Sequence, residues 1–243
     1  MTFNKKEFRG FTLIELILGL SIFALVALNV YSIYTGGIRL SRRADTQNTM
    51  FREARMALDL MAFDLENMIP YDFSNSYPQQ TAFRGEENKI TFLMATSDGL
   101  NVVSYFLVVP EKVSIHRVII GKRTSKNVRI SNVTQQGLRL ESLVRKEQSL
   151  ISYLNGEDNE SLTELIAVNV KEGSLKFSFA YLKDEESQEA IWKDAWGLNY
   201  IPSRIRLKID FVNPSDLNTI PFTKEILVPH GFWGADESGA SSA

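Results

Sequence analysis

The sequence predicts an α+β protein in which a long N-terminal helix, apolar in its first half and amphipathic in its second, packs on a mostly antiparallel β-sheet. Three observations lead to this prediction. The run from Phe11 to Leu28 is apolar except for Glu15. Apolar residues from Met50 to Met68 then recur at helical spacing. From Lys89 onward, short runs with alternating apolar residues are broken by turn residues.

The composition excludes several classes of protein. The 243 residues are 44% hydrophobic and 23% charged, with 14 Gly and 7 Pro, which excludes collagen-like and wholly disordered chains. A formal net charge of −2 provides no basic field for phosphates, so no nucleic-acid partner is predicted. The absence of cysteine excludes disulfides, thiol catalysis and Cys-ligated metals.

The apolar run, FTLIELILGLSIFALVAL, is long enough to cross a membrane. A helix that rises about 1.5 Å per residue needs roughly 20 residues to cross a hydrocarbon core of about 30 Å. Basic residues flank the run on both sides, so charge alone does not orient the helix. These flanking residues are Lys5, Lys6 and Arg9 before the run and Arg39, Arg42 and Arg43 after it.

Two simple interpretations of this segment are incomplete. A cleavable secretory signal would have a shorter core and a small-residue exit, and no convincing A-x-A site follows Leu28. A plain signal anchor accounts for the length and the flanks. It leaves Glu15 unexplained, because an ionisable group in a membrane helix is costly and usually has a partner and a function.

The residues Arg9-Gly10-Phe11-Thr12-Leu13-Ile14-Glu15 resemble the processing site of type IV pilin-like proteins, which include the pseudopilins of type II secretion. The resemblance implies that residues 1–10 form a cytoplasmic leader, that prepilin peptidase cuts between Gly10 and Phe11, and that Phe11 is N-methylated. It also implies that Glu15 pairs with the N-terminal ammonium of a neighbouring subunit during assembly. Such a pair is reasonable in lipid, where each charge alone would be costly.

The helix is expected to continue to about Ile69, with residues 11–35 as the transmembrane and filament-core part and residues 36–70 as the amphipathic part. Gly36 and Gly37 predict a kink or local melting. Pro70 is expected to end the helix. The apolar stripe of the second part consists of Met50, Ala54, Ala57, Leu58, Met61, Leu65 and Met68.

Residues 71–233 are expected to form a periplasmic β-rich domain, with residues 234–243 as a disordered tail. Asp98-Gly99 between two strand-like runs predicts a hairpin. The segments Tyr71–Glu87 and Asn155–Ser161 are expected to be irregular. Strands are predicted in 89–96, 101–109, 113–120, 137–144, 164–173, 174–182, 203–212 and 222–229, with the clearest alternation in 174–182 and 203–212.

No catalytic, cofactor or metal site is predicted. His116 and His230 are the only histidines, and each is better explained as a strand or loop residue than as a catalyst. The acidic clusters 157–160 and 184–186 could offer oxygen ligands to calcium, but neither has EF-hand spacing. Four aromatic residues are expected to pack in the core or at a sheet edge, with an interface role as the alternative. They are Trp192, Trp196, Tyr200 and Trp233.

A second pattern narrows the resemblance to the J-type minor pseudopilin of type II secretion. It consists of Arg52-x-x-Arg55-x-x-Leu58-x-x-Met61-x-x-Asp64-Leu65, Phe83-x-Gly85, a run ending in Phe92, Val102-Val103-x-Tyr105, Trp196, Pro202-x-x-Ile205-x-Leu207 and Val228-Pro229.

The J-type resemblance implies a single-pass bacterial inner-membrane protein with a periplasmic C-terminal domain, incorporated into the pseudopilus tip in support of protein export. Its implied partners are the minor pseudopilins of the I, K and H types, the major pseudopilin and prepilin peptidase. A minor pilin of a type IV pilus or competence system and an adhesive or binding module at a pilus tip remain alternatives.

Overall fold

The computed structural model describes residues 12–71, 83–109, 117–120, 123–124, 137–157, 161–182, 190–198, 200–229 and 231. The chain divides into an N-terminal unit, Met1–Gln47, and a C-terminal unit, Asn48–Ala243. The boundary falls inside the long helix α1 (Leu13–Glu66). The expected leader 1–10 and tail 234–243 lie outside the described residues.

The helix of the N-terminal unit is uninterrupted, so the expected local melting at Gly36 and Gly37 is wrong. Each glycine in a helix interior costs about 1 kcal/mol relative to alanine, which does not outweigh the hydrogen bonds on either side. Neither position is enforced by crowding, because an added Cβ at Gly36 or Gly37 would meet no atom within 4 Å.

The part of α1 in the C-terminal unit carries the predicted apolar stripe, and all seven stripe residues are buried. The helix ends at Glu66, earlier than the predicted end near Ile69. Met68 instead forms a β-bridge with Met94, and the Ile69 N–H donates to the Leu93 carbonyl at 2.8 Å. Pairing with the sheet therefore ends the helix before Pro70 does.

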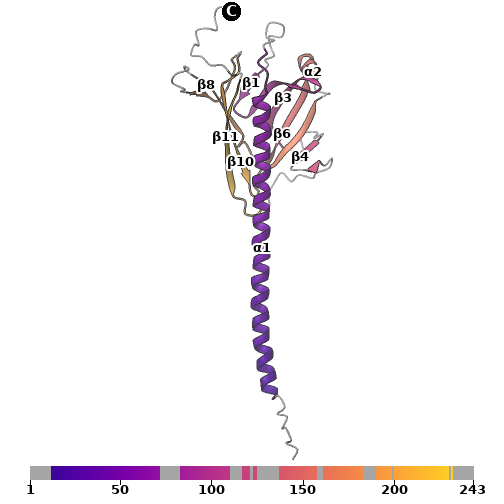
Figure 1. The fold of residues 1–243 in the computed structure, drawn as a ribbon, viewed down its shortest axis with the longest axis vertical. Helices are drawn as coiled ribbons and strands as arrows, with labels where there is room; N and C mark the ends of the chain where they lie inside the picture. The colour runs from indigo at the N-terminus through magenta and orange to yellow at the C-terminus, as the bar shows by residue number, and fades with distance from the viewer. Residues whose placement is uncertain are drawn as a thin grey trace, which may run out of the picture. The chain divides into compact units, whose positions relative to one another are not determined.

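The C-terminal unit contains a mostly antiparallel sheet against which α1 packs, which confirms the predicted fold class (Figure 1). The spatial order is β1 (Phe83–Glu86), β2 (Lys89–Thr96), β3 (Gly99–Val108), β6 (Leu140–Ser149), β7 (Leu162–Lys171), β10 (Arg204–Val212), β8 (Lys176–Leu182) and β9 (Ala190–Lys193). Strand β11 (Thr219–Leu227) pairs with β10, and β4 (Arg117–Ile120) pairs with β5 (Arg123–Thr124) and, in parallel, with β7. The helix α2 (Leu150–Asn155) follows β6.

The predicted hairpin at Asp98-Gly99 is confirmed, since it joins β2 to β3. The prediction that Tyr71–Glu87 is irregular is wrong for its last part, because Phe83–Glu86 pairs with β2 as strand β1. Strand β9 and helix α2 were not predicted either. These short elements depend on pairing with the rest of the sheet or on a Ser149 cap, rather than on a long apolar pattern.

The sheet curls until its first strand meets the segment after β9. The N–H of Gly85 donates to the Trp196 carbonyl at 3.2 Å, and the Trp196 N–H donates back to the Gly85 carbonyl at 2.8 Å. A Cβ at Gly85 would lie 2.4 Å from the ring of Phe179, so only glycine fits this close approach. The Phe177 N–H adds a third hydrogen bond, to the Glu87 carbonyl at 2.7 Å.

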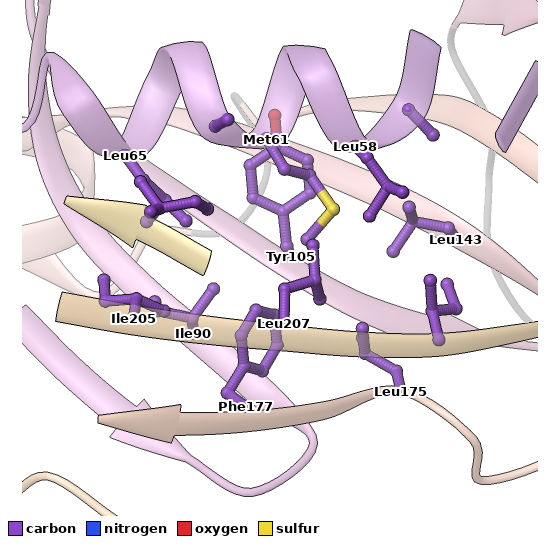
Figure 2. Close-up of a cluster of buried hydrophobic side chains, with 14 of the residues drawn as sticks. Leu58, Met61, Leu65, Ile90, Tyr105, Leu143, Leu175, Phe177, Ile205 and Leu207 are labelled. Atoms are coloured by element: carbon purple, nitrogen blue, oxygen red, sulfur yellow. The ribbon is translucent and has the colours of Figure 1, made fainter. Parts of the chain in front are cut away.

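One apolar core lies between α1 and the sheet (Figure 2). Leu58, Met61 and Leu65 point from the helix toward side chains of the sheet, including Phe177 and Leu207. The predicted alternation is confirmed. Its buried members are Leu175, Phe177 and Phe179 beside and within β8, and Ile205, Leu207, Ile209 and Phe211 in β10.

Two side-chain contacts join strand β11 to α1. Lys224 Nζ lies 2.6 Å from Asp59 Oδ1, and the Phe222 ring lies 5.6 Å from the Phe51 ring in an edge-to-face arrangement. Within the described residues, the strand partner of β11 is β10, where Pro221 is paired with Asp210.

Candidate functional site

The first turn of α1 forms a reciprocal cap between Thr12 and Glu15. The Thr12 N–H and its hydroxyl each donate to Glu15 Oε2 at 3.1 Å, while Thr12 Oγ1 accepts the Glu15 N–H at 3.4 Å. This is a capping box, in which a threonine and a glutamate three residues later satisfy donors that the helix start leaves free. It orients the Glu15 carboxylate toward the N-terminal end of the helix.

The surface around this carboxylate is apolar and uncovered. Large apolar side chains from Leu13 to Tyr34 are 55–75% exposed, whereas the stripe residues of the C-terminal unit are buried. Among the described residues, α1 is the one helix long and apolar enough to cross a membrane. A helix that is apolar on all sides requires an apolar environment around it.

The residues of the implied cleavage site, Gly10 and Phe11, lie outside the described residues. Glu15 is therefore the part of the predicted site that the structure places. Sequence reasoning missed the role of Thr12, although the spacing T-x-x-E before an apolar run is a recognisable capping signal.

A second set of ionisable groups is buried where α1 meets the sheet; we name it the Asp64 cluster. Asp64 Oδ2 accepts from Arg145 Nε at 2.7 Å and from the Tyr105 hydroxyl at 2.7 Å. Arg145 also pairs with Glu147, and its Nη1 lies 3.3 Å from Glu164 Oε2. The cluster joins α1 to β3, β6 and β7.

The electrostatics of the Asp64 cluster keep its donors protonated. Burial raises the pKa of Tyr105 well above its usual value, and the Asp64 carboxylate raises it further. Burial alone would lower the pKa of Arg145, but its contacts with Asp64, Tyr105 and Glu147 together outweigh burial and raise the pKa. The raised pKa values of Tyr105 and Arg145 keep both groups as hydrogen-bond donors to Asp64 at neutral pH.

Sequence reasoning included Asp64 and Tyr105 in the J-type pattern but did not foresee that they touch. The available signal was that Asp64 lies three residues after Met61 and four before Met68, on the apolar stripe itself. A charge at such a position requires a partner from the sheet. Sequence alone did not indicate Arg145 as that partner.

The face of β1, β2, β3 and β6 opposite α1 carries a polar groove of about 470 Å³. The hydroxyls of Thr91 and Ser104 lie 2.9 Å apart in it, and Arg84 is paired with Glu86 at 2.8 Å. Burial raises the pKa of Tyr153, and Arg84 partly opposes that shift. The groove is lined by Arg84, Glu86, Lys89, Thr91, Val102, Ser104, Lys146, Gln148, Tyr153 and Gly156.

Several other sequence candidates lie outside the described residues, namely His116, His230, Trp233, residues 158–160 and residues 184–186. In the described part of the chain, no group of three or more His, Cys, Asp or Glu side chains could hold a metal ion. Trp196 packs in the core and donates its indole N–H to the Tyr200 carbonyl at 2.6 Å. Trp192 stacks under the Arg206 guanidinium at 3.9 Å.

Comparison with protein families supplies one further observation. Residues 5–28 match the family model described as the prokaryotic N-terminal methylation motif. The chain carries this motif, and its α+β fold is pilin-like. The motif of the type IV pilin and pseudopilin family, the long apolar helix and the curled antiparallel sheet together describe a structural subunit of the kind that prepilin peptidase processes.

The apolar helix of this pilin-like protein is consistent with a single-pass anchor in the inner membrane. The family also implies partners, namely the peptidase and the other subunits of an assembled filament. Comparison with curated proteins and with solved structures found no match.

Proposed function

We propose that this pilin-like protein is a J-type minor pseudopilin of a type II secretion system. Prepilin peptidase cuts it between Gly10 and Phe11, and Phe11 is then N-methylated. The mature chain assembles at the pseudopilus tip with minor pseudopilins of the I, K and H types and supports protein export across the outer membrane. The observation that carries the proposal is the Glu15 carboxylate at the start of an uncovered apolar helix.

The mechanism is an exchange of partners at Glu15. In the single chain the carboxylate accepts from the N–H and hydroxyl of Thr12, which satisfies hydrogen bonds without neutralising charge. Cleavage creates a free amino group on Phe11, next to Thr12. An ammonium and a carboxylate are each unfavourable in lipid, so contact between Phe11 of one subunit and Glu15 of its neighbour favours assembly and sets the helix register.

Processing also changes the charge of the chain. The leader holds three basic residues and one acidic residue, so its loss moves the formal net charge from −2 to −4. The intact mass of membrane-extracted protein should correspond to residues 11–243 with one added methyl group. An uncut protein from cells that contain active peptidase would contradict the proposal.

The J-type assignment is supported by the packing of residues from the second sequence pattern. Leu58, Met61 and Leu65 are buried against Phe92 and Tyr105 in one core, so these residues act as a packing unit. On the opposite side of α1, Phe63 is 62% exposed. Burial of this ring against a partner would be favourable, so Phe63 is the position at which subunit docking is tested.

The test is co-purification of the processed full chain with candidate I-, K- and H-type minor pseudopilins. We expect a stable complex, weakened by Phe63→Ser. The matched control is Ile151→Ser, since Ile151 is 73% exposed on a different helix, α2, which packs on β3 and β6. A chain that binds none of these subunits but enters a type IV pilus would favour the minor-pilin alternative.

The polar groove favours a second candidate function, a binding module at a pilus tip. Its floor of hydroxyl and amide groups beside basic residues could hold a polar ligand. A Thr91→Val and Ser104→Ala double variant separates the two functions. It should leave the minor-pseudopilin complex intact, whereas loss of adhesion or cargo capture with this variant would favour the binding module.

A further inference from the structure

The segment of α1 after the apolar run carries aromatic and basic residues in a fixed order. Tyr31 and Tyr34 come first and are 67% and 66% exposed. Arg39, Arg42 and Arg43 follow and are exposed as well. We name these five residues the tyrosine–arginine belt. All five belong to the N-terminal unit.

Helix geometry places the belt at membrane-interface depth. At about 1.5 Å per residue, Tyr31 and Tyr34 lie roughly 24–28 Å along the axis from Glu15, and Arg39 lies about 36 Å from it. The hydrocarbon core is about 30 Å thick. With Glu15 at one edge of the core, the tyrosines reach the opposite edge and the arginines reach the phosphate layer beyond it.

The belt occupies one side of the helix. At about 100° per residue, its five members fall within an arc of roughly 180°. Thr35 and Ile38 lie on the same arc and are half-buried, unlike every other residue from Thr12 to Asp45. Side chains on a helix lean toward its N-terminus, so the three arginines reach back toward the membrane rather than away from it.

The positive charge of the belt is uncompensated in its own segment. Among the described residues, no ion pair or side-chain hydrogen bond engages the guanidinium groups of Arg39, Arg42 or Arg43. The sequence has no acidic residue between Glu15 and Asp45. Loss of the leader removes Lys5, Lys6 and Arg9, which leaves the belt as the cationic cluster that flanks the apolar run in the mature chain.

We propose that the tyrosine–arginine belt binds the phosphate groups of anionic phospholipids in the leaflet opposite the Glu15 end of the helix. The inference rests on the proposed function, because it takes the apolar run as membrane-spanning. The guanidinium group of arginine forms paired hydrogen bonds to phosphate oxygens. Tyrosine side chains are favoured at the boundary between headgroups and acyl chains. The acyl chains of a phospholipid can also contact the adjoining apolar helix. A soluble phosphate has no such chains, so the surface favours a lipid.

The test uses the processed full chain in nanodiscs that contain equal amounts of phosphatidylglycerol and phosphatidylcholine. Native mass spectrometry counts the lipids retained on the released protein. We expect the wild-type chain to retain phosphatidylglycerol preferentially. The variant with Arg39→Gln, Arg42→Gln and Arg43→Gln should reduce that preference about tenfold, because each basic residue near the surface strengthens anionic-lipid binding.

Two further variants define what the result means. The triple replacement Arg39→Lys, Arg42→Lys and Arg43→Lys should retain most of the preference, because it keeps the charge. Arg52→Gln with Arg55→Gln, farther along the same helix, should retain all of it. Equal lipid ratios for the wild-type chain and the triple glutamine variant would overturn the proposal, as would an equal loss in the Arg52 and Arg55 control.

Millimolar inorganic phosphate, added to the released complex, should not displace the retained phosphatidylglycerol. Displacement would indicate a simple phosphate site and would overturn the lipid assignment. Failure of the proposed function is seen separately, as a retained leader or as no binding to minor pseudopilins. Neither of those results depends on the lipid ratio, so the two failures are distinguishable.

Discussion

The two stretches of α1, one in each unit, differ in how far their side chains are buried. Leu20 in the N-terminal unit is 68% exposed, whereas Leu65 in the C-terminal unit is fully buried. The first stretch is apolar on all sides, and the second carries a single apolar stripe. The pattern of the second stretch therefore matches the sheet that covers it, and the pattern of the first requires an apolar environment outside the single chain.

The carboxylates of the two stretches differ in the same way. Asp64 has a basic partner in its own chain, Arg145, together with the Tyr105 hydroxyl. Glu15 has hydrogen-bond donors from Thr12 but no counter-charge among the described residues. The C-terminal unit neutralises its own buried charge, whereas under the proposed function a neighbouring subunit supplies the opposite charge to Glu15.

The largest effect is expected at Glu15. Glutamine keeps the capping interaction with Thr12 but removes the charge, so Glu15→Gln should leave expression and cleavage intact and reduce incorporation into filaments to below about a tenth. Shearing of filaments followed by immunoblotting measures this. Thr12→Ser is the control, because it retains a capping hydroxyl and the charge. Normal incorporation of Glu15→Gln would show that the two carboxylates do not differ as described.

The next effect is on packing. Leu65→Ala should lower the free energy of unfolding of the C-terminal unit by about 4 kcal/mol, because it removes a fully buried side chain. The matched change Leu20→Ala should leave that free energy unchanged. Urea unfolding of the full chain in detergent, followed by tryptophan fluorescence, measures both. Equal losses would contradict the contrast between the two stretches.

A smaller loss is expected at the Asp64 cluster. Asp64→Asn keeps the shape but removes the charge that faces Arg145, and it should cost about 2 kcal/mol. The loss is limited because Glu147 and Glu164 remain beside Arg145. The same urea titration measures it, with the exposed Glu66→Gln in the same helix as control. A change within error would mean that the cluster contributes nothing to holding α1 on the sheet.

The smallest effect is expected at the surface pair between α1 and β11. Lys224→Gln removes the contact with Asp59, whose side chain is 72% exposed, and should cost less than about 1 kcal/mol. The difference from wild type should disappear in 1 M salt, because solvent-exposed pairs are screened. A larger loss that persists at high salt would mean that Lys224 contributes mainly through packing.

The sequence predicted those parts of the fold that have a long local pattern. The stripe from Met50 to Met68 and the alternation in β8 and β10 follow from helical and strand periodicity, and both were correct. The end of α1 was not predictable, because pairing of Met68 with Met94 decides it. Strand β1 is only four residues long and pairs with the adjacent β2, and its second neighbour, Trp196, is more than 100 residues away.

The candidate site was predictable to a similar extent. Glu15 was identified because a charge in an apolar run is conspicuous at any position. Its contact with Thr12 was available from spacing and was missed. The contact between Asp64 and Arg145 joins residues 81 positions apart, and no local pattern indicates which basic residue of the sheet faces the helix.

The edge of β11 that faces away from β10 affects how two copies of this chain can pair. An open strand edge invites a second copy to extend the sheet, which leads to aggregation. Among the described residues of this edge is Pro221, which has no N–H to donate. A second copy would therefore find one backbone donor missing from the row that sheet extension requires, which disfavours pairing of two sheets at this edge.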